Sequence, residues 1–290
     1  MAKKGRSDKK TKSKPAKKRT SFIVSAVVIL CVIGLVFLVL NPGVVEATAT
    51  AELVDISGVV EVKQGETWTT AESNMELYES DSVRTGENSS ASIVIFKGSI
   101  IRLDSNTEVT LTEIIQQEEG NSVTIDQEFG RTWSTVQGIS GIDDYEVQTP
   151  TAVASVRGTS FDVNVSENGT TIIGVIRGIV NVSTTINGTV YTVELNENYS
   201  VTVDFDEMGD PQDFDQDDWI ANNLLKDEGF VEDIKSVLRE RIEPYLDEIA
   251  DLLGEPIPEE HIDVLIGEFI QGRSLPPETP DHILEIFDLS

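Results

Sequence analysis

The sequence contains very few of the residues on which disulfide, metal and nucleophilic chemistry depend. It has one cysteine, Cys31, and two histidines, His261 and His282, in 290 residues. A single cysteine excludes an intrachain disulfide. Both histidines lie near the C-terminal end, where no Ser-His-Asp or paired-histidine pattern surrounds them. We therefore predict that the protein is not an enzyme, and we assign no catalytic, cofactor-binding or metal-binding residues and no cofactor.

Positive charge is also scarce over most of the chain. The first 20 residues hold ten Lys and Arg and one acid, which leaves 12 basic and 50 acidic residues for the rest. A chain of this charge repels nucleic acid and anionic surfaces, so we exclude nucleic acid as a partner. The acidic stretch from Asp204 to Trp219 does not fit a calcium-binding EF-hand loop. Counted from Asp213, the positions that require Gly and Glu hold Asp218 and Leu224.

One long apolar run is present near the N-terminus. Residues 22–40 carry no charge, and a helix of this length, at about 1.5 Å per residue, approaches the roughly 30 Å thickness of a bilayer core. They predict a transmembrane helix. By the positive-inside rule, residues 1–21 form a basic cytoplasmic tail, and residues 41–50 form a linker. We expect a single-pass protein of the cell membrane with an extracytoplasmic C-terminal domain; the alternative is secretion after cleavage near Ala49.

The remaining sequence has two parts that differ in composition and in the spacing of apolar residues. In residues 51–205, short runs rich in Val, Ile and Thr, such as "ASIVIF" and "FDVNV", alternate with Gly, Asn, Asp and Ser and predict strands joined by turns. An acidic linker at 206–214 follows. In residues 215–290 the apolar residues recur at helical spacing, which predicts a helical C-terminal region. The expected fold is mainly β, with a C-terminal α-helical segment and one N-terminal transmembrane helix.

Several short motifs occur in a recognisable order within the β-rich part. They are "VRTG" (Arg84, Thr85, Gly86), "KGSIIRL" (Gly98, Arg102) and "TPTAVASVRGTSF" (Thr149, Pro150, Arg157, Gly158, Thr159, Phe161). Through these motifs the region resembles the extracytoplasmic FecR-type β-domain, a family named for a regulator of iron-dicitrate transport. By this resemblance, these residues are the structural motif of the family.

The resemblance implies an all-β domain built as a solenoid-like or rolled stack of short strands. Periodicity alone leaves a β-sandwich as the alternative. Classical family members place a cytoplasmic anti-sigma domain before the membrane helix, whereas here a basic tail precedes it. We therefore predict a binding or scaffold module at the cell surface, integral to the membrane, with a protein or surface-polymer partner. The alternative is a transmembrane signalling or regulatory receptor that works through a membrane partner.

Two further features are expected at the turns between strands. Arg157 is expected to hold a turn by donating to backbone carbonyls or to a carboxylate, with Gly158 permitting the turn. Six N-x-S/T sequons are expected at turns on the outer side of the membrane. They are candidate N-glycosylation sites in this acidic protein: Asn88, Asn164, Asn168, Asn181, Asn187 and Asn198.

Overall fold

The computed structural model describes residues 51–116, 120–254, 256–258 and 261–271, together with Thr279 and Ile283. All of them belong to one compact unit, Thr48–Ser290. The predicted tail (1–21), membrane helix (22–40) and linker (41–50) lie outside the described residues. Within the described part, no helix combines the length and the apolar character needed to cross a membrane.

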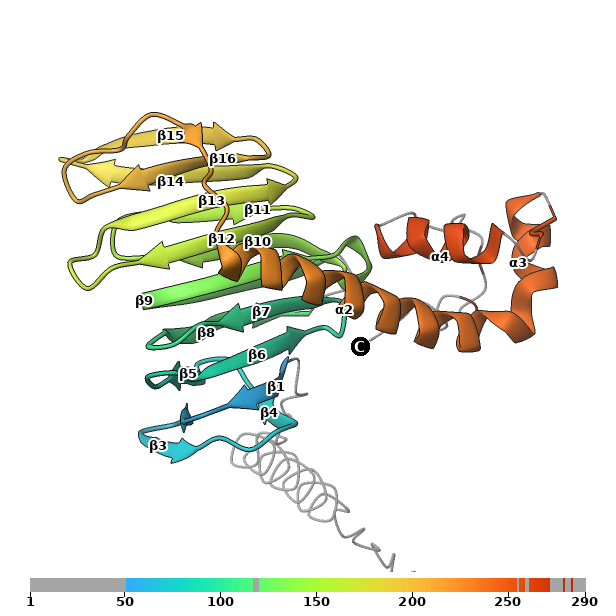
Figure 1. The fold of residues 1–290 in the computed structure, drawn as a ribbon. Coiled ribbons are helices and arrows are strands. Elements are labelled where there is room, and N and C mark those ends of the chain that lie inside the picture. The colour runs from blue at the N-terminus through green and yellow to red at the C-terminus, as the bar shows by residue number, and fades with distance from the viewer. Residues whose placement is uncertain are drawn as a thin grey trace, which may run out of the picture. The chain divides into compact units, whose positions relative to one another are not determined.

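In the described part of the chain, seventeen strands form two sheets that are joined through one shared strand, β9 (Figure 1). The first sheet has the order β4 (Met75–Leu77), β1 (Ala51–Ser57), β6 (Ser90–Ile95), β7 (Ser99–Leu103), β9 (Asn121–Val136), β12 (Ser160–Val165), β13 (Thr171–Arg177), β16 (Tyr199–Val203), β17 (Gln212–Asp213). The second has the order β3 (Thr67–Thr70), β2 (Val60–Gln64), β5 (Ser82–Thr85), β8 (Glu108–Ile115), β9, β10 (Ile142–Gln148), β11 (Val153–Val156), β14 (Val180–Ile186), β15 (Thr189–Leu195).

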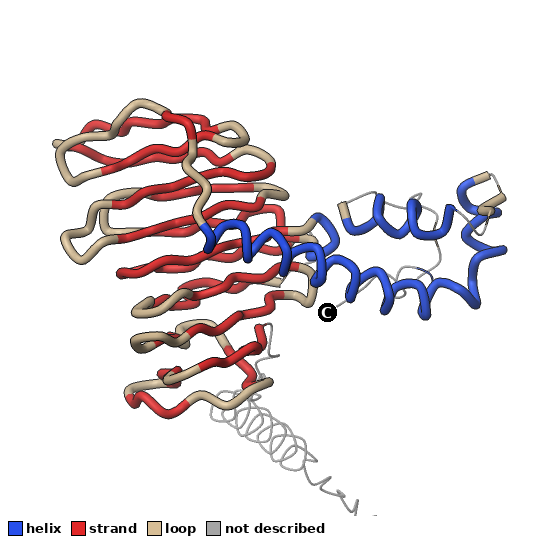
Figure 2. Tube along the Cα trace, viewed as in Figure 1, coloured by secondary structure: helices blue, strands red, loops and turns tan. Residues whose placement is uncertain are grey.

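The two sheets share one hydrophobic core. Alternating side chains such as Leu53 and Ile93 of the first sheet and Val62 and Val109 of the second point inward, and each is at most 1% exposed. Consecutive strands pair as hairpins in both sheets, with β6–β7 and β12–β13 in the first and β8–β9, β10–β11 and β14–β15 in the second. The chain therefore builds the stack layer by layer, as Figure 2 shows.

Strand β9 changes sheets in its middle. Its N-terminal half pairs with β8 and β10, and its C-terminal half pairs with β7 and β12. The change occurs at Gly130, whose φ is +90°. A Cβ at this position would lie 2.4 Å from the Thr107 Cα, so a side chain would meet backbone. Glycine is required here both for the backbone angle and for the close approach.

The helical region begins with α2 (Asp218–Ile242), followed by η2 (Glu243–Tyr245), α3 (Leu246–Leu253) and α4 (Ile262–Ile270). Pro244 lies in η2, because proline cannot continue the hydrogen bonding of α2. Leu238, Ile242 and Ile266 belong to a second core, which also contacts Ile139 of the short helix η1 (Gly138–Ser140). In Figure 1, α2 starts over the strands and continues beyond them, where α3 and α4 lie.

The prediction of a mainly β fold with a C-terminal helical segment is confirmed. The segment predicted as an acidic linker, residues 206–214, contains the two-residue strand β17. Its Gln212 and Asp213 pair with Ser200 and Tyr199 of β16.

Candidate functional site

A buried ion pair fixes α2 to the first sheet. Arg102 of β7 contacts Asp227 of α2 through its Nη1, and the two side chains are 4% and 8% exposed. The second oxygen of Asp227 accepts hydrogen bonds from Thr135 Oγ1 at 2.6 Å and from Trp133 Nε1 at 3.1 Å. Both oxygens of the buried carboxylate are therefore satisfied by strands β7 and β9. Removing the helix would leave the Arg102 charge without its partner.

A second polar network holds the first turn of α2. Arg131 of β9 donates from Nε to Asp162 Oδ1 at 2.8 Å and from Nη1 to Asp217 Oδ2 at 2.6 Å. Asp217 is the N-cap of α2 and accepts from the Ile220 N–H at 3.0 Å. Trp219 Nε1 donates to Asp162 Oδ1 at 3.2 Å. The same arginine thus connects a buried carboxylate of the sheet to the cap of the helix.

The two carboxylates of this network have pKa values displaced in opposite directions. Burial raises the pKa of Asp162 to about 6, although Arg131 and Trp219 both favour its ionised form. For Asp217, partial burial acts to raise the pKa, but the hydrogen bonds from Arg131 and from the helix backbone outweigh it and the pKa is lowered. Asp162 is therefore the group of this network that titrates between pH 4 and 7.

The raised pKa of Asp162 predicts a pH dependence that an Asp162→Asn variant should lose. Between about pH 4 and 6 the folded protein binds this proton and the unfolded chain does not, so acidification from pH 7 stabilises the wild type by at most about 3 kcal/mol. Urea denaturation at pH 7, 6 and 5 should show the wild type gaining stability relative to the variant as pH falls. Parallel pH profiles for the two proteins would contradict the assignment.

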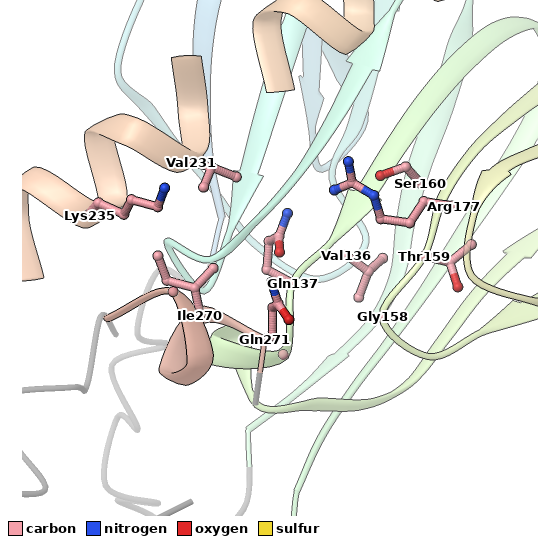
Figure 3. A pocket seen from close by; sticks show the side chains of 12 residues that line it. Val136, Gln137, Gly158, Thr159, Ser160, Arg177, Val231, Lys235, Ile270 and Gln271 are labelled. Atoms are coloured by element: carbon pink, nitrogen blue, oxygen red, sulfur yellow. The ribbon is translucent and has the colours of Figure 1, made fainter. Parts of the chain in front are cut away.

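A cavity of about 510 Å³ lies where β9 and β13 end and β12 begins, facing η1, α2 and α4. Two basic side chains line it, Arg177 from β13 and Lys235 from α2. The polar side chains of Ser160, Gln137 and Gln271 line it as well. In Figure 3, Arg177 and Lys235 enter from opposite sides with Gln137 between them. No aspartate or glutamate is among the described residues that line this cavity.

Comparison with known proteins identifies the β-rich part. Residues 81–181 match the family model described as FecR protein. The chain contains a FecR domain. Comparison with curated proteins gives no match. Two crystal structures of a candidate anti-sigma factor from Parabacteroides distasonis are similar to this chain, each with 20% sequence identity and a TM-score of 0.39. The similarity covers 46% of this chain and 60% of theirs, so it spans less than two thirds of those proteins.

The first group of predicted motif residues lies in and beside strands of the FecR domain. Arg84 pairs with Glu61 at 2.8 Å and stacks on Trp68, with its Cζ 4.1 Å from the ring centroid. The Thr85 hydroxyl accepts from the Thr107 N–H at 3.0 Å. At Gly86 the N–H donates to a backbone carbonyl, that of Val59, at 2.8 Å.

Gly98 and Arg102 complete this group. A Cβ on Gly98 would lie 2.8 Å from the backbone nitrogen of Ser140, so glycine allows η1 to approach the β6–β7 turn. Arg102 is the motif residue that the structure connects to the helical region, through Asp227. The sequence alone does not identify Asp227 as the partner of Arg102.

The second group, Thr149 to Phe161, surrounds strand β11. The Thr149 hydroxyl accepts from the Ala152 N–H at 2.9 Å and closes a turn over Pro150. Phe161 is fully buried and meets Tyr145 edge-on, with ring centroids 6.1 Å apart.

Gly158 and Thr159 lie where β11 turns toward β12. Gly158 has φ +64° and so permits the turn, and Thr159 donates to the Ile179 carbonyl at 3.1 Å. Of all the predicted motif residues, these two line the cavity that contains Arg177.

Arg157 lies at the protein surface beside Asp143. Its side chain is 78% exposed, and Nη2 donates to Asp143 Oδ1 at 2.8 Å. The expected carboxylate contact is present, but exposed ion pairs contribute only about 0–1 kcal/mol. Arg102, in contrast to Arg157, is buried.

Four sequons lie in turns or loops and are exposed: Asn88, Asn168, Asn187 and Asn198. The turn expectation is wrong for the other two, because Asn164 lies in β12 and Asn181 in β14. Asn181 is exposed and Asn164 is half-buried. Among the described residues, no group of His, Cys, Asp and Glu could hold a metal ion.

Proposed function

We propose that this protein is a membrane-anchored, non-enzymatic binding or scaffold module whose FecR domain acts outside the membrane as a rolled stack of strands. The open edge of strand β15 supports the binding role. β15 is the last strand of the second sheet, and among the described strands it pairs only with β14. A strand with one unpaired edge can accept a strand from another protein.

The side chains of this edge strand favour pairing over protection. Natural proteins usually block open edges with charges or proline, but β15 has no charged residue or proline from Thr189 to Val193. Val190 is 66% exposed and Tyr191 is 49% exposed. In a chain of which 25% is charged, the uncharged stretch from Thr189 to Val193 fits a protein partner that adds an extended segment.

The edge proposal predicts a position-specific contact in the native membrane. A photoreactive amino acid in place of Tyr191 in the full-length chain should crosslink to one protein of defined mass. The same group in place of Leu225, which is 66% exposed on α2, is the matched control. Val190→Lys with Thr192→Lys should reduce the crosslink about tenfold or more, because charge on an edge strand opposes pairing. Equal labelling from both positions, or an unchanged crosslink in the lysine variant, would contradict the proposal.

The second candidate function is signalling or regulation through a membrane partner, and the match of residues 81–181 to the FecR family favours it. A relay requires a specific contact on the inner side of the membrane. Scrambling residues 1–20 at constant charge should then abolish the response while the protein remains in the membrane fraction. If the scrambled tail supports the same response, the tail acts only as a topology signal. Recovery of the protein from the medium would instead indicate cleavage near Ala49.

A further inference from the structure

The cavity lined by Arg177 and Lys235 carries positive charge, whereas the protein as a whole is strongly acidic. The chain holds 51 acidic and 22 basic residues, yet the described residues lining this cavity include these two basic side chains and no acid. Ser160 and Arg177 are paired neighbours of β12 and β13, so their relative positions are fixed by the sheet. Lys235 faces them from α2, which the buried pair of Arg102 and Asp227 holds in place.

Several polar side chains in this cavity have no hydrogen-bond partner among the described residues. Ser160 is 2% exposed, lines the cavity, and its hydroxyl makes no hydrogen bond to the described residues. The side chains of Gln137, Gln271 and Arg177 likewise have no partner in the described part of the chain. The Ser160 hydroxyl reaches the solvent of the cavity, since the buried side-chain atom without a partner in the described residues is Asn223 Oδ1. The arrangement therefore provides donors for an anionic ligand.

Two carboxylates near the cavity, those of Glu232 and Glu197, already accept contacts from other groups of the protein. Lys235 Nζ contacts Glu232 Oε1 at 2.6 Å, which occupies one of its three donors. Glu197 Oε1 accepts from the Gly178 N–H at 3.0 Å. Arg177 forms no ion pair with a described carboxylate. Its planar fork matches two oxygens of one carboxylate.

The remaining wall of the cavity is apolar. Val136 and Ile270 are at most 4% exposed, and Val231 of α2 is half-buried beside them. The volume of about 510 Å³ falls within the roughly 300–1,000 Å³ of small-molecule sites. A ligand that used both walls would carry an anionic end and a hydrocarbon or aromatic body.

We propose that this cavity binds a small organic carboxylate. Arg177 forms the bidentate contact, Lys235 adds the second positive charge, Ser160 donates its hydroxyl, and the apolar body of the ligand lies against Val136 and Ile270. The proposal goes beyond partner binding at β15, since it uses a different surface. The failure of either proposal leaves the other intact.

The test follows the arginine side-chain Nε–H resonances of the full-length protein by NMR during titration with benzoate. The Arg177 resonance, assigned by its loss in Arg177→Gln, should shift and saturate. Arg157, exposed on the same domain, is the internal control and should not saturate. Benzamide, the uncharged analogue, and inorganic sulfate, an anion without an apolar body, should each bind at least about tenfold more weakly than benzoate.

Variants locate the contacts. Lys235→Gln should weaken benzoate binding at Arg177 by about tenfold and Ser160→Ala by several-fold, while Lys226→Gln, an exposed lysine of the same helix, should leave it unchanged. Equal shifts at Arg177 and Arg157 would overturn the proposal, as would equal binding of benzamide. Sulfate binding as tight as that of benzoate would overturn the assignment to an organic carboxylate.

Discussion

Replacing Asp227 with alanine is expected to destabilise the protein by about 3–5 kcal/mol, because it leaves the buried guanidinium of Arg102 without its partner. Trp133 and Thr135 lose the same acceptor. Urea denaturation followed by tryptophan fluorescence measures the effect, since Trp133 is fully buried beside the substituted residue. Hydrogen exchange along α2 would separate release of the helix from unfolding of the sheets.

Two further variants give this prediction its controls. Glu228→Ala changes the next residue of α2, which is exposed, and should alter stability by no more than about 0.5 kcal/mol. The double replacement Arg102→Met with Asp227→Leu removes both charges, and it should recover most of the lost stability because no buried charge remains unpaired. A double variant as unstable as Asp227→Ala would show that the loss comes from packing.

The second large effect is expected at Gly130, where β9 passes from one sheet to the other. Alanine there should cost about 3 kcal/mol or more, because it combines the strain of positive φ with overpacking against backbone. The nearest backbone atoms are the Thr107 Cα at 2.4 Å and the Asn106 carbonyl oxygen at 2.5 Å, which cannot rotate away. Thermal and urea unfolding of the variant would measure the loss.

Gly188→Ala is the matched control for this substitution. Gly188 also has positive φ, +77°, but no atom lies within 4 Å of the Cβ that alanine would add. Its replacement should therefore cost about 1 kcal/mol, the backbone strain alone. Equal losses at the two positions would mean that the close approach to Thr107 contributes little.

The regular elements could be predicted because hydrophobic periodicity reports directly on burial. Phe161, Val163 and Val165 alternate in the sequence, and all three are at most 2% exposed in β12. Ile234 and Leu238 recur at helical spacing and are buried in the second core. Both patterns are local, so neither needs knowledge of distant residues.

The polar contacts could not be predicted in the same way. Asp227 is one of 51 acidic residues, and nothing in its neighbourhood distinguishes it from the exposed Glu228. Arg102 and Arg157 both belong to motifs of the family, but a side chain's depth depends on what covers its strand. Helix α2 covers Arg102, whereas Arg157 projects from a turn. Such differences arise from tertiary packing and leave no local signal.

The ion pair between Arg102 and Asp227 also affects the order in which parts of the protein fold during synthesis. The two residues are 125 positions apart, so at a synthesis rate of about 5–20 residues per second the arginine emerges about 6–25 seconds before its partner. Hairpins form within microseconds. The sheets can therefore assemble around a hydrated Arg102 that only later becomes enclosed. Enclosure of Arg102 therefore waits until α2 has been synthesised.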